Sequence, residues 1–384
     1  MTGPLSLAPK TIMVTSNANY HNLIVRAHIP TLKAGTFSVR LANTVVDTLQ
    51  VNRGDGVDLT WIVDDMKRGE TFKYQISQLL KTSRKRDSIT MTKSSGNDIN
   101  VAIDGKPFTT YDNHTGPNKP YFYPMYSSTG KLVLRHYGVE TVSGETHDHP
   151  HHRGMWFTHG DVNGQDFWSE DAKSAKTITT RIEPHNGSIA ATLMTSTDWI
   201  SNDGKKIATD ERSATFYTIP NGRMMDVEIK MTPVGGPLTF GDTKEGSFGM
   251  RLPDSMRVVG GDGHINSDTG VKDAKTWGKK AAWVDYFGTV DGELTGIAIF
   301  DATDNLRHPS TWHVRDYGLF AVNPFGLHDF DNDKANPKKG NYTVEVGKSL
   351  SFKYRIFIHK GNTLSSHIQE VWNSYSIPPT VQIK

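Results

Sequence analysis

Histidines are concentrated in one short segment of the chain. The stretch HDHPHHR, which begins at His147, holds four of the 16 histidines, and His159 follows closely. An imidazole titrates near neutral pH, so clustered histidines suit proton transfer or metal binding. If the segment is extended, alternate side chains face the same way. His147, His149 and His151 then share one side, and His152 faces the other.

Three interpretations of this segment are open. In the first, three histidines act as general acids and bases on a sugar, and these are His149, His152 and His159. Glu170 is then the carboxylate partner, and Arg153 binds an anionic group or developing negative charge. This interpretation requires no cofactor.

In the second interpretation, the histidines hold a divalent metal ion. The expected ligands are His147, His149, His151 and Asp161, with Glu170 as a further candidate. Cysteine is absent from the sequence, so any metal must use histidine, carboxylate or backbone oxygen ligands. In the third interpretation the imidazoles are structural and only hydrogen-bond within a polar loop.

A second concentration of polar and aromatic residues lies between Arg307 and Asn323 and includes the string RHPSTWHVRDYG. Aromatic rings beside Arg, His and Asn suit a sugar site, because a ring covers the apolar face of a pyranose while polar groups hold its hydroxyls. The alternative is a long loop anchored by its aromatic residues. The predicted substrate-binding residues are His151, Arg153, Trp168, Asp285, Arg307, His308, Trp312, His313 and Asn323.

The composition excludes several classes of partner. The chain has 384 residues, with 43 basic and 41 acidic side chains and a net charge of +2. That balance offers no electrostatic footprint for nucleic acid or an anionic membrane surface. No apolar run is long enough for a transmembrane helix. The amino terminus lacks a signal-peptide pattern. We expect a periplasmic or extracellular protein whose leader is not part of this sequence, with the cytoplasm as the alternative.

The elements that must position these residues are predicted to be strands. Short β-like segments at residues 21–29, 37–41, 59–63 and 72–79 indicate a small β-sandwich, and the basic run KTSRKR at residues 81–86 indicates a linker. We therefore predict two domains, 1–86 and 87–384. Beyond the linker, five pairs of Asn-Gly or Asp-Gly separate β-like segments and predict antiparallel hairpins, beginning at Asp104, Asn186, Asp203, Asn221 and Asp291.

One helix is predicted near the carboxyl end. Its apolar face would be formed by Leu364, Ile368, Val371, Trp372 and Tyr375, which follow helical spacing. Asn362 or Thr363 would cap its start, and Pro378 would end it.

Two long motifs carry a family resemblance. They are HDHPHHRGMWFTHGDVNGQDFW, residues 147–168, and WVDYFGTVDGELTGIAIFDATDNLRHPSTWHVRDYGLFAVNPFG, residues 283–326. Over residues 88–360 the chain resembles a bacterial family labelled PmoA-like or DUF6807. A methane monooxygenase subunit would need membrane spans that this sequence lacks, so the label is a misnomer. The resemblance implies an antiparallel β-supersandwich similar to galactose mutarotase and an association with bacterial sugar catabolism. Aldose epimerases of that fold use a histidine acid and a carboxylate base, but their motif is absent here, so no residue role is carried over.

Together these observations predict a carbohydrate-active enzyme, a hydrolase, lyase or epimerase, with a histidine-rich acid/base site in a concave β-sheet cleft. Glycoside hydrolysis normally uses two carboxylates, and the main cluster is richer in histidine, which favours proton-transfer chemistry. The alternatives are a non-catalytic carbohydrate-binding module and a metal-dependent enzyme with histidine ligands.

Overall fold

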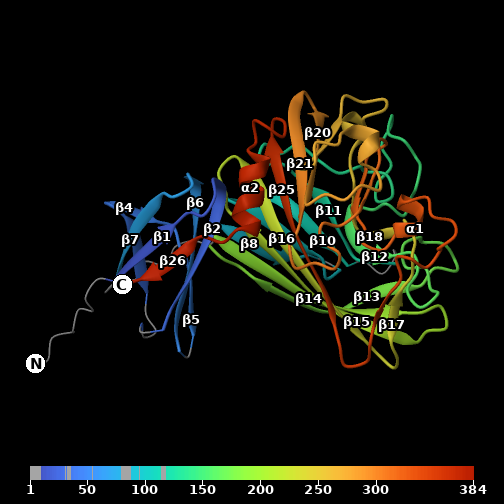
Figure 1. Cartoon of the computed structure of the whole chain (residues 1–384), viewed down its shortest axis with the longest axis horizontal. Helices are drawn as coiled ribbons and strands as arrows, with labels where there is room; N and C mark the ends of the chain where they lie inside the picture. The colour runs from blue at the N-terminus through green and yellow to red at the C-terminus, as the bar shows by residue number, and fades with distance from the viewer. Residues whose placement is uncertain are drawn as a thin grey trace, which may run out of the picture.

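Antiparallel strands make up most of the molecule (Figure 1). The computed structural model describes residues 10–30, 32, 36–53, 55–78, 88–94, 96–113 and 118–384. The prediction of a mainly β, antiparallel fold is confirmed. In this part of the chain, no helix has the length and apolar character needed to cross a membrane.

Two eight-stranded sheets form the larger part of the molecule (Figure 1). The first sheet has the strand order β22-β23-β18-β12-β11-β10-β9-β8, and the second has the order β13-β14-β15-β16-β25-β21-β20-β19. The strands of the first sheet are β8 (Ile89–Lys93), β9 (Ile99–Ile103), β10 (Lys106–Asp112), β11 (Tyr121–Met125), β12 (Met155–His159), β18 (Gly246–Arg251), β22 (Trp312–Val314) and β23 (Leu319–Val322). Those of the second are β13 (Lys176–His185), β14 (Ala190–Ile200), β15 (Lys206–Tyr217), β16 (Gly222–Pro233), β19 (His264–Ser267), β20 (Trp283–Val290), β21 (Glu293–Asp301) and β25 (Leu350–Lys360). The strands β17 (Leu238–Phe240) and β24 (Tyr342–Val344) pair separately, and α1 (Leu327–Phe330) is a single helical turn.

The main hydrophobic core lies between these two sheets. Phe157 of β12 packs against Trp199 of β14 and Phe352 of β25, with ring centroids 6.2 and 5.6 Å apart. Because side chains alternate along a strand, the neighbouring Trp156 points to the outer face of the first sheet. Yet every residue of β12 and β18 is buried. Loops must therefore cover the outer face, and one of them is the histidine segment.

The predicted hairpin turns fall between consecutive antiparallel strands. Asp104 and Asp291 and the glycine after each have positive φ, as a two-residue turn requires. Asn221 also has positive φ, and it joins β15 to β16. Asn186 and Asp203 precede the turns that join β13 to β14 and β14 to β15. These turns create the meander that the sequence predicts.

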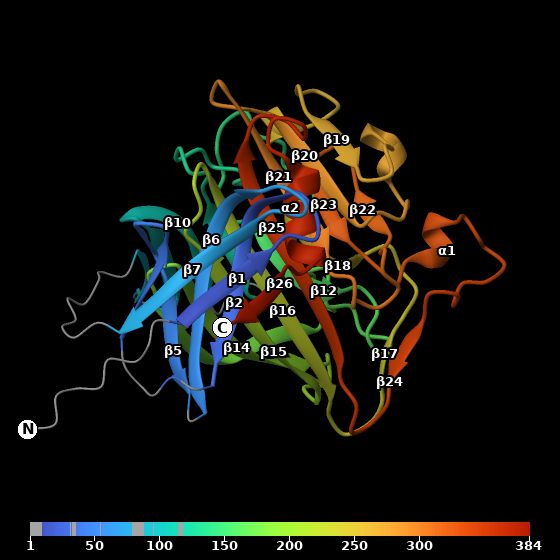
Figure 2. The same ribbon diagram turned by 60° about the vertical axis from the view of Figure 1, so that its left-hand side comes forward.

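A separate sandwich forms at the amino-terminal end, with its own hydrophobic core. Its strands are β1 (Lys10–Thr15), β2 (Tyr20–Ile29), β3 (Phe37–Leu41), β4 (Thr44–Val46), β5 (Leu49–Arg53), β6 (Gly56–Met66) and β7 (Thr71–Gln78). The carboxyl-terminal strand β26 (Thr380–Ile383) joins this sandwich by pairing with β1 (Figure 2). The prediction assigned that strand to residues 87–384, and it is corrected here because β1 offers it an open sheet edge. The predicted boundary at residue 86 lies outside the described residues.

The helix α2 (Ile368–Ser376) packs between the small sandwich and the second large sheet (Figure 1). Ile368 and Val371 are fully buried there beside Ile24 of β2. The helix begins four residues later than the predicted apolar face, and Leu364 is 87% exposed. Asn362 accepts hydrogen bonds from the backbone N–H groups of residues 364 and 365 and so caps a turn that precedes the helix.

The position of the helix start can be tested by a pair of substitutions. Val371→Ala is expected to lower the free energy of unfolding by about 2 kcal/mol, because it opens a cavity between α2 and the sheet. Leu364→Ala is expected to change it by less than about 0.5 kcal/mol, because the side chain is exposed. Urea unfolding of both variants provides the measurement, and equal losses would contradict the observed helix start.

Candidate functional site

The histidine segment covers the outer face of the first sheet at β12 and β18. Trp156 of β12 lies opposite Gly249 of β18 in the sheet register. A Cβ at position 249 would lie 3.4 Å from the rings of both Trp156 and Trp168, so both rings lie directly over this part of the sheet. The two ring centroids are 5.0 Å apart, and the histidine segment packs on these rings.

Asp148 forms the centre of a charged cluster within this segment. It accepts hydrogen bonds from Arg251 at 2.7 Å and from Arg135, and both arginine side chains have no exposed surface. Burial raises the pKa of Asp148, but the two arginines outweigh that effect and hold it at about 2. Asp148 is therefore a carboxylate at neutral pH. Arg135 also donates to the backbone oxygen of His149, which ties the loop to the cluster.

His149 lies beside this carboxylate. Its Nδ1 lies 3.2 Å from Asp148 Oδ2, and its ring is stacked between His152 and Tyr317 at centroid distances of 4.7 and 5.4 Å. Its φ of 45° lies in the left-handed region, which is uncommon for histidine and is found often at functional sites. Its side chain is 42% exposed, and no described residue pairs with Nε2. One ring nitrogen thus lies beside a carboxylate, the stacking of His152 and Tyr317 sets the plane of the ring, and the other nitrogen remains accessible.

His152 lies beneath His149 and is buried. Its ring stacks on Trp156 at 5.4 Å, and its Nδ1 lies 3.3 Å from Arg251 Nη1. Burial, together with the positive charge nearby, lowers the pKa of His152 well below its ordinary value. It is therefore neutral and accepts the arginine hydrogen bond at Nδ1. Its Nε2 is buried without a partner in the described structure.

A second charged cluster lies beside the first. Glu170 contacts Arg153 Nε at 2.7 Å and Lys119 Nζ at 2.9 Å, and Lys119 also donates to the backbone oxygen of Trp168. Burial lowers the pKa of Lys119, and Glu170 opposes that shift. Burial, with help from the Lys119 charge, lowers the pKa of His151 to about 4. Glu170 and Arg153 are therefore engaged with each other, and His151 is neutral beside them.

The two segments singled out in the sequence meet here, but through residues that the prediction did not name. Tyr317 stacks on His149, and the guanidinium carbons of Arg251 and Arg315 lie 4.7 and 5.5 Å from its ring centre. Arg315 also lies over the ring of Trp277 at 5.6 Å. Tyr317 and Arg315 lie within the predicted string RHPSTWHVRDYG. The prediction therefore located the segment that reaches the histidines, but it named other residues of that segment.

Most predicted residues of that second segment hold the backbone in place. Arg307 donates to three carbonyl oxygens, those of residues 324, 340 and 341. Asn323 donates to two carbonyls and accepts from two backbone N–H groups. Trp312 is fully buried in the main core and donates to the carbonyl of residue 281. These side chains form their hydrogen bonds with the protein's own backbone.

The two histidines of the second segment are separated from each other. His308 pairs with Asp301 at 2.9 Å and stacks on Trp372 of α2, so it belongs to the α2 interface. His313 lies on the outer face of β22, opposite Ala321 of β23, but it is only 2% exposed. Burial lowers its pKa to about 3, so it is neutral.

Three further predicted residues lie away from the cluster or are occupied. His159 has no exposed surface, and its Nε2 contacts the carbonyl of residue 241 at 2.7 Å while its Nδ1 contacts Ser247. Asp161 accepts from the backbone N–H of residue 164 in a turn. Asp285 lies on the outer face of the second sheet, where it pairs with His359 at 2.9 Å and accepts from Thr363.

The predicted metal ligands are not assembled. The ring of His147 stacks on Tyr137 at 4.5 Å, away from His149, and Asp161 is engaged in its own turn. Among the described residues, no group of three or more His, Asp or Glu side chains is arranged to hold a metal ion. The geometry therefore gives no support to the metal interpretation.

No local pattern in the sequence marks Lys119, Arg135, Arg251 or Glu245. Glu245 precedes β18, and burial raises its pKa while the charges of Lys244 and His149 oppose the shift. The pairing of β12 with β18 places Arg251 beside Gly154, next to the histidine segment, and Glu245 beside Gly160 at the other end of β12.

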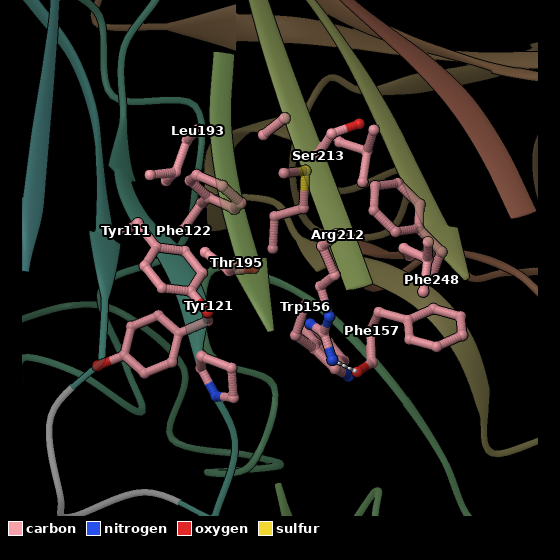
Figure 3. A pocket seen from close by; sticks show the side chains of 15 residues that line it. Tyr111, Tyr121, Phe122, Trp156, Phe157, Leu193, Thr195, Arg212, Ser213 and Phe248 are labelled. Carbon is pink, nitrogen blue, oxygen red and sulfur yellow. Dashed lines mark hydrogen bonds between the residues drawn. The ribbon is translucent and has the colours of Figure 1, made fainter. Parts of the chain in front are cut away.

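A pocket lies between the two sheets (Figure 3). Its lining is mainly apolar and includes Tyr111, Phe122 and Phe248. Arg212 is the charged residue of the lining, and it is already paired with Asp210 at 2.7 Å. This pocket belongs to the packing of the core, and we assign it no chemistry.

The chain is a member of a family whose activity is not known. It matches the Family of unknown function (DUF6807) over residues 98–373, and it therefore belongs to that family, as the two motifs indicated. No curated protein matches the sequence.

Two solved structures are similar to 98% of this chain. One is a protein in the Glycosyl Hydrolase Family 38 from Enterococcus faecalis, with 11% identity, a TM-score of 0.47 and 47% of its own chain covered. The other is an alpha-mannosidase from Enterococcus faecalis V583, with 9% identity, a TM-score of 0.46 and 46% covered. The present chain thus spans less than half of either protein, and similarity this distant does not bear on activity.

Proposed function

We propose that the protein is a carbohydrate-active enzyme that works by proton transfer, with His149 as the acid/base residue. The observation that carries this proposal is the Asp148–His149 pair. Asp148 is ionised and fixed by two buried arginines, and His149 presents its other nitrogen to solvent. Stacking between His152 and Tyr317 fixes the plane of the His149 ring, one nitrogen lies 3.2 Å from the carboxylate, and the second is free to take or give a proton.

The neighbouring groups support the same chemistry. Burial raises the pKa of Glu245, whose carboxylate lies 3.7 Å from Lys244 just before β18, and we assign it the second proton. Arg315 and Tyr317 lie on the other side of His149, where a cation stabilises negative charge that develops on the substrate. An acid, a base and a cation favour epimerisation or elimination at a sugar carbon. Hydrolysis would need a second free carboxylate, and Glu170 is engaged by Lys119 and Arg153.

The test is a solvent-exchange assay with a panel of neutral and acidic sugars in deuterated water. Proton abstraction is expected to introduce deuterium into the substrate or to yield an epimer or an unsaturated product. His149→Asn is expected to lower the rate by about 100-fold or more. Asparagine tolerates positive φ, so the loop is expected to keep its conformation.

The matched control is His185→Asn, which changes an exposed histidine on β13. It is expected to retain the wild-type rate. If the wild type exchanges no proton with any sugar of the panel, or if His149→Asn exchanges as fast as the wild type, the proposal is wrong.

A further inference from the structure

Arg223, the second residue of β16, is buried without an acidic partner. Its exposed fraction is 6%, and its Nε is buried with no hydrogen-bond partner in the described structure. Its one hydrogen bond is a long contact of 3.5 Å from Nη1 to the carbonyl of Gly222. Burial lowers its pKa, and the charge of Asp104, which forms no ion pair with it, opposes that shift. A guanidinium in this position is incompletely compensated.

The other buried arginines of the described chain differ from Arg223. Arg135 and Arg251 share Asp148, and Arg355 pairs with Asp226. Arg212, whose side chain is 10% exposed, pairs with Asp210. A buried charge that lacks a partner costs several kcal/mol in general. The contrast with the paired arginines indicates that the unpaired charge of Arg223 is kept for binding an anion.

Arg223 lines a pocket of about 280 Å³ at the end of the sandwich. The lining residues with polar side chains are Lys106, Tyr126, Ser127, Ser128, Thr129 and Arg223. Thr129 donates to Glu293, and Ser127 then donates to Thr129, so these two hydroxyls are occupied. Lys106, Tyr126, Ser128 and Arg223 remain as donors.

The charge around the pocket is favourable to an anion. Lys106 and Arg223 line it, whereas the nearby Glu293 does not and is itself offset by Lys360 at 3.6 Å. The volume holds an oxyanion with several waters, since a water occupies about 30 Å³. A planar guanidinium beside an ammonium and a hydroxyl matches the oxygens of a tetrahedral anion.

We propose that this pocket binds one oxyanionic group, a sulfate or a phosphate, through Arg223, Lys106 and Ser128. The group is either a free ion or a substituent on a sugar. The inference does not depend on the proposed function, because it concerns a different part of the molecule.

Calorimetric titration with inorganic sulfate and phosphate at constant ionic strength tests this site. The wild type is expected to bind saturably, and Arg223→Gln is expected to weaken binding by at least tenfold. Arg181→Gln removes an exposed arginine that already pairs with Glu183, and it is expected to bind as the wild type does. His149→Asn is also expected to bind normally, which separates this site from the proposed catalytic site. A sulfated monosaccharide that binds more tightly than inorganic sulfate assigns the group to a sugar, and equal or weaker binding assigns it to the free ion.

Thermal unfolding gives a second readout. Without added anion, Arg223→Met is expected to unfold at the same temperature as the wild type or higher, because it removes an unpaired buried charge. With sulfate, the wild type, Arg181→Gln and His149→Asn are expected to gain a saturable increase in unfolding temperature, whereas Arg223→Gln and Arg223→Met are not. The proposal is overturned if neither anion nor the sulfated sugar binds saturably, if Arg223→Gln binds equally well, or if Arg223→Met lowers the unfolding temperature with no anion present.

Discussion

Asp148→Ala is expected to destabilise the protein by about 3 kcal/mol, because it leaves Arg135 and Arg251 buried without their shared carboxylate. Both arginine side chains are completely buried, and each would retain its charge. Removing one partner of a buried ion pair generally costs about 3–5 kcal/mol. We expect the lower end of that range, since the Asp148 side chain is 41% exposed and water can enter in its place. Urea unfolding at neutral pH measures the loss.

Two further variants make this result specific. Glu211→Ala removes a carboxylate that is 68% exposed and lies 3.9 Å from Lys230, and it is expected to cost less than about 0.5 kcal/mol. Adding Arg135→Met to Asp148→Ala is expected to recover part of the loss, because it removes one unpaired charge. If Asp148→Ala is no more damaging than Glu211→Ala, the arginines do not depend on Asp148.

The same carboxylate links stability to the proposed chemistry. Asp148 neutralises two buried arginines and also lies 3.2 Å from His149 Nδ1. The positive φ of His149 places its ring between His152 and Tyr317. The strained backbone is thus maintained by the cluster that surrounds it, so substitutions in the cluster are expected to affect turnover even where they do not touch a substrate.

The fold class and the location of this cluster could be predicted because both depend on short patterns of neighbouring residues. Short β-like segments and Asn-Gly or Asp-Gly turns repeat along the chain and are typical of an antiparallel meander. Four histidines within six residues likewise mark the segment without any knowledge of the fold. The strand β26 was not foreseen, because its pairing with β1 joins opposite ends of the chain.

The residues that complete the site could not be predicted because their contacts are long-range. Arg251 reaches Asp148 through the pairing of β12 with β18, which is a property of the folded sheet. Composition also cannot distinguish a side chain that binds a ligand from one that binds its own backbone. Arg307 and Asn323 have the residue types of a sugar site, yet they hold carbonyls and amides of the surrounding loops.

The protein is expected to lose stability steeply as the pH falls from about 6.5 to about 4. His152, His159 and His313 are buried, and burial lowers the pKa of His159 to about 4, that of His313 to about 3, and that of His152 well below its ordinary value. All three are neutral in the folded state, whereas the unfolded chain protonates them below about pH 6.5. The unfolded state then binds more protons, so the free energy of unfolding decreases as the pH falls. Burial also lowers the pKa of His151 to about 4, so it adds to the same slope. Each histidine contributes about 1 kcal/mol per pH unit, and the four together remove several kcal/mol, which is comparable to the total stability of a typical domain.

Urea unfolding at a series of pH values between 7 and 4 measures this slope. His159→Gln is expected to flatten the slope by about one quarter, since it removes one of the four histidines whose pKa is lowered, whereas His185→Gln on the exposed surface is expected to leave it unchanged. Asp148 affects the free energy of unfolding in a separate pH range. Its pKa of about 2 lies below the ordinary value, so the stability that it contributes is present above pH 4 and disappears only as the pH falls toward 2. A wild-type slope of zero between pH 6 and pH 5 would show that the buried imidazoles are already charged in the folded protein, and Arg251 could not then donate to His152.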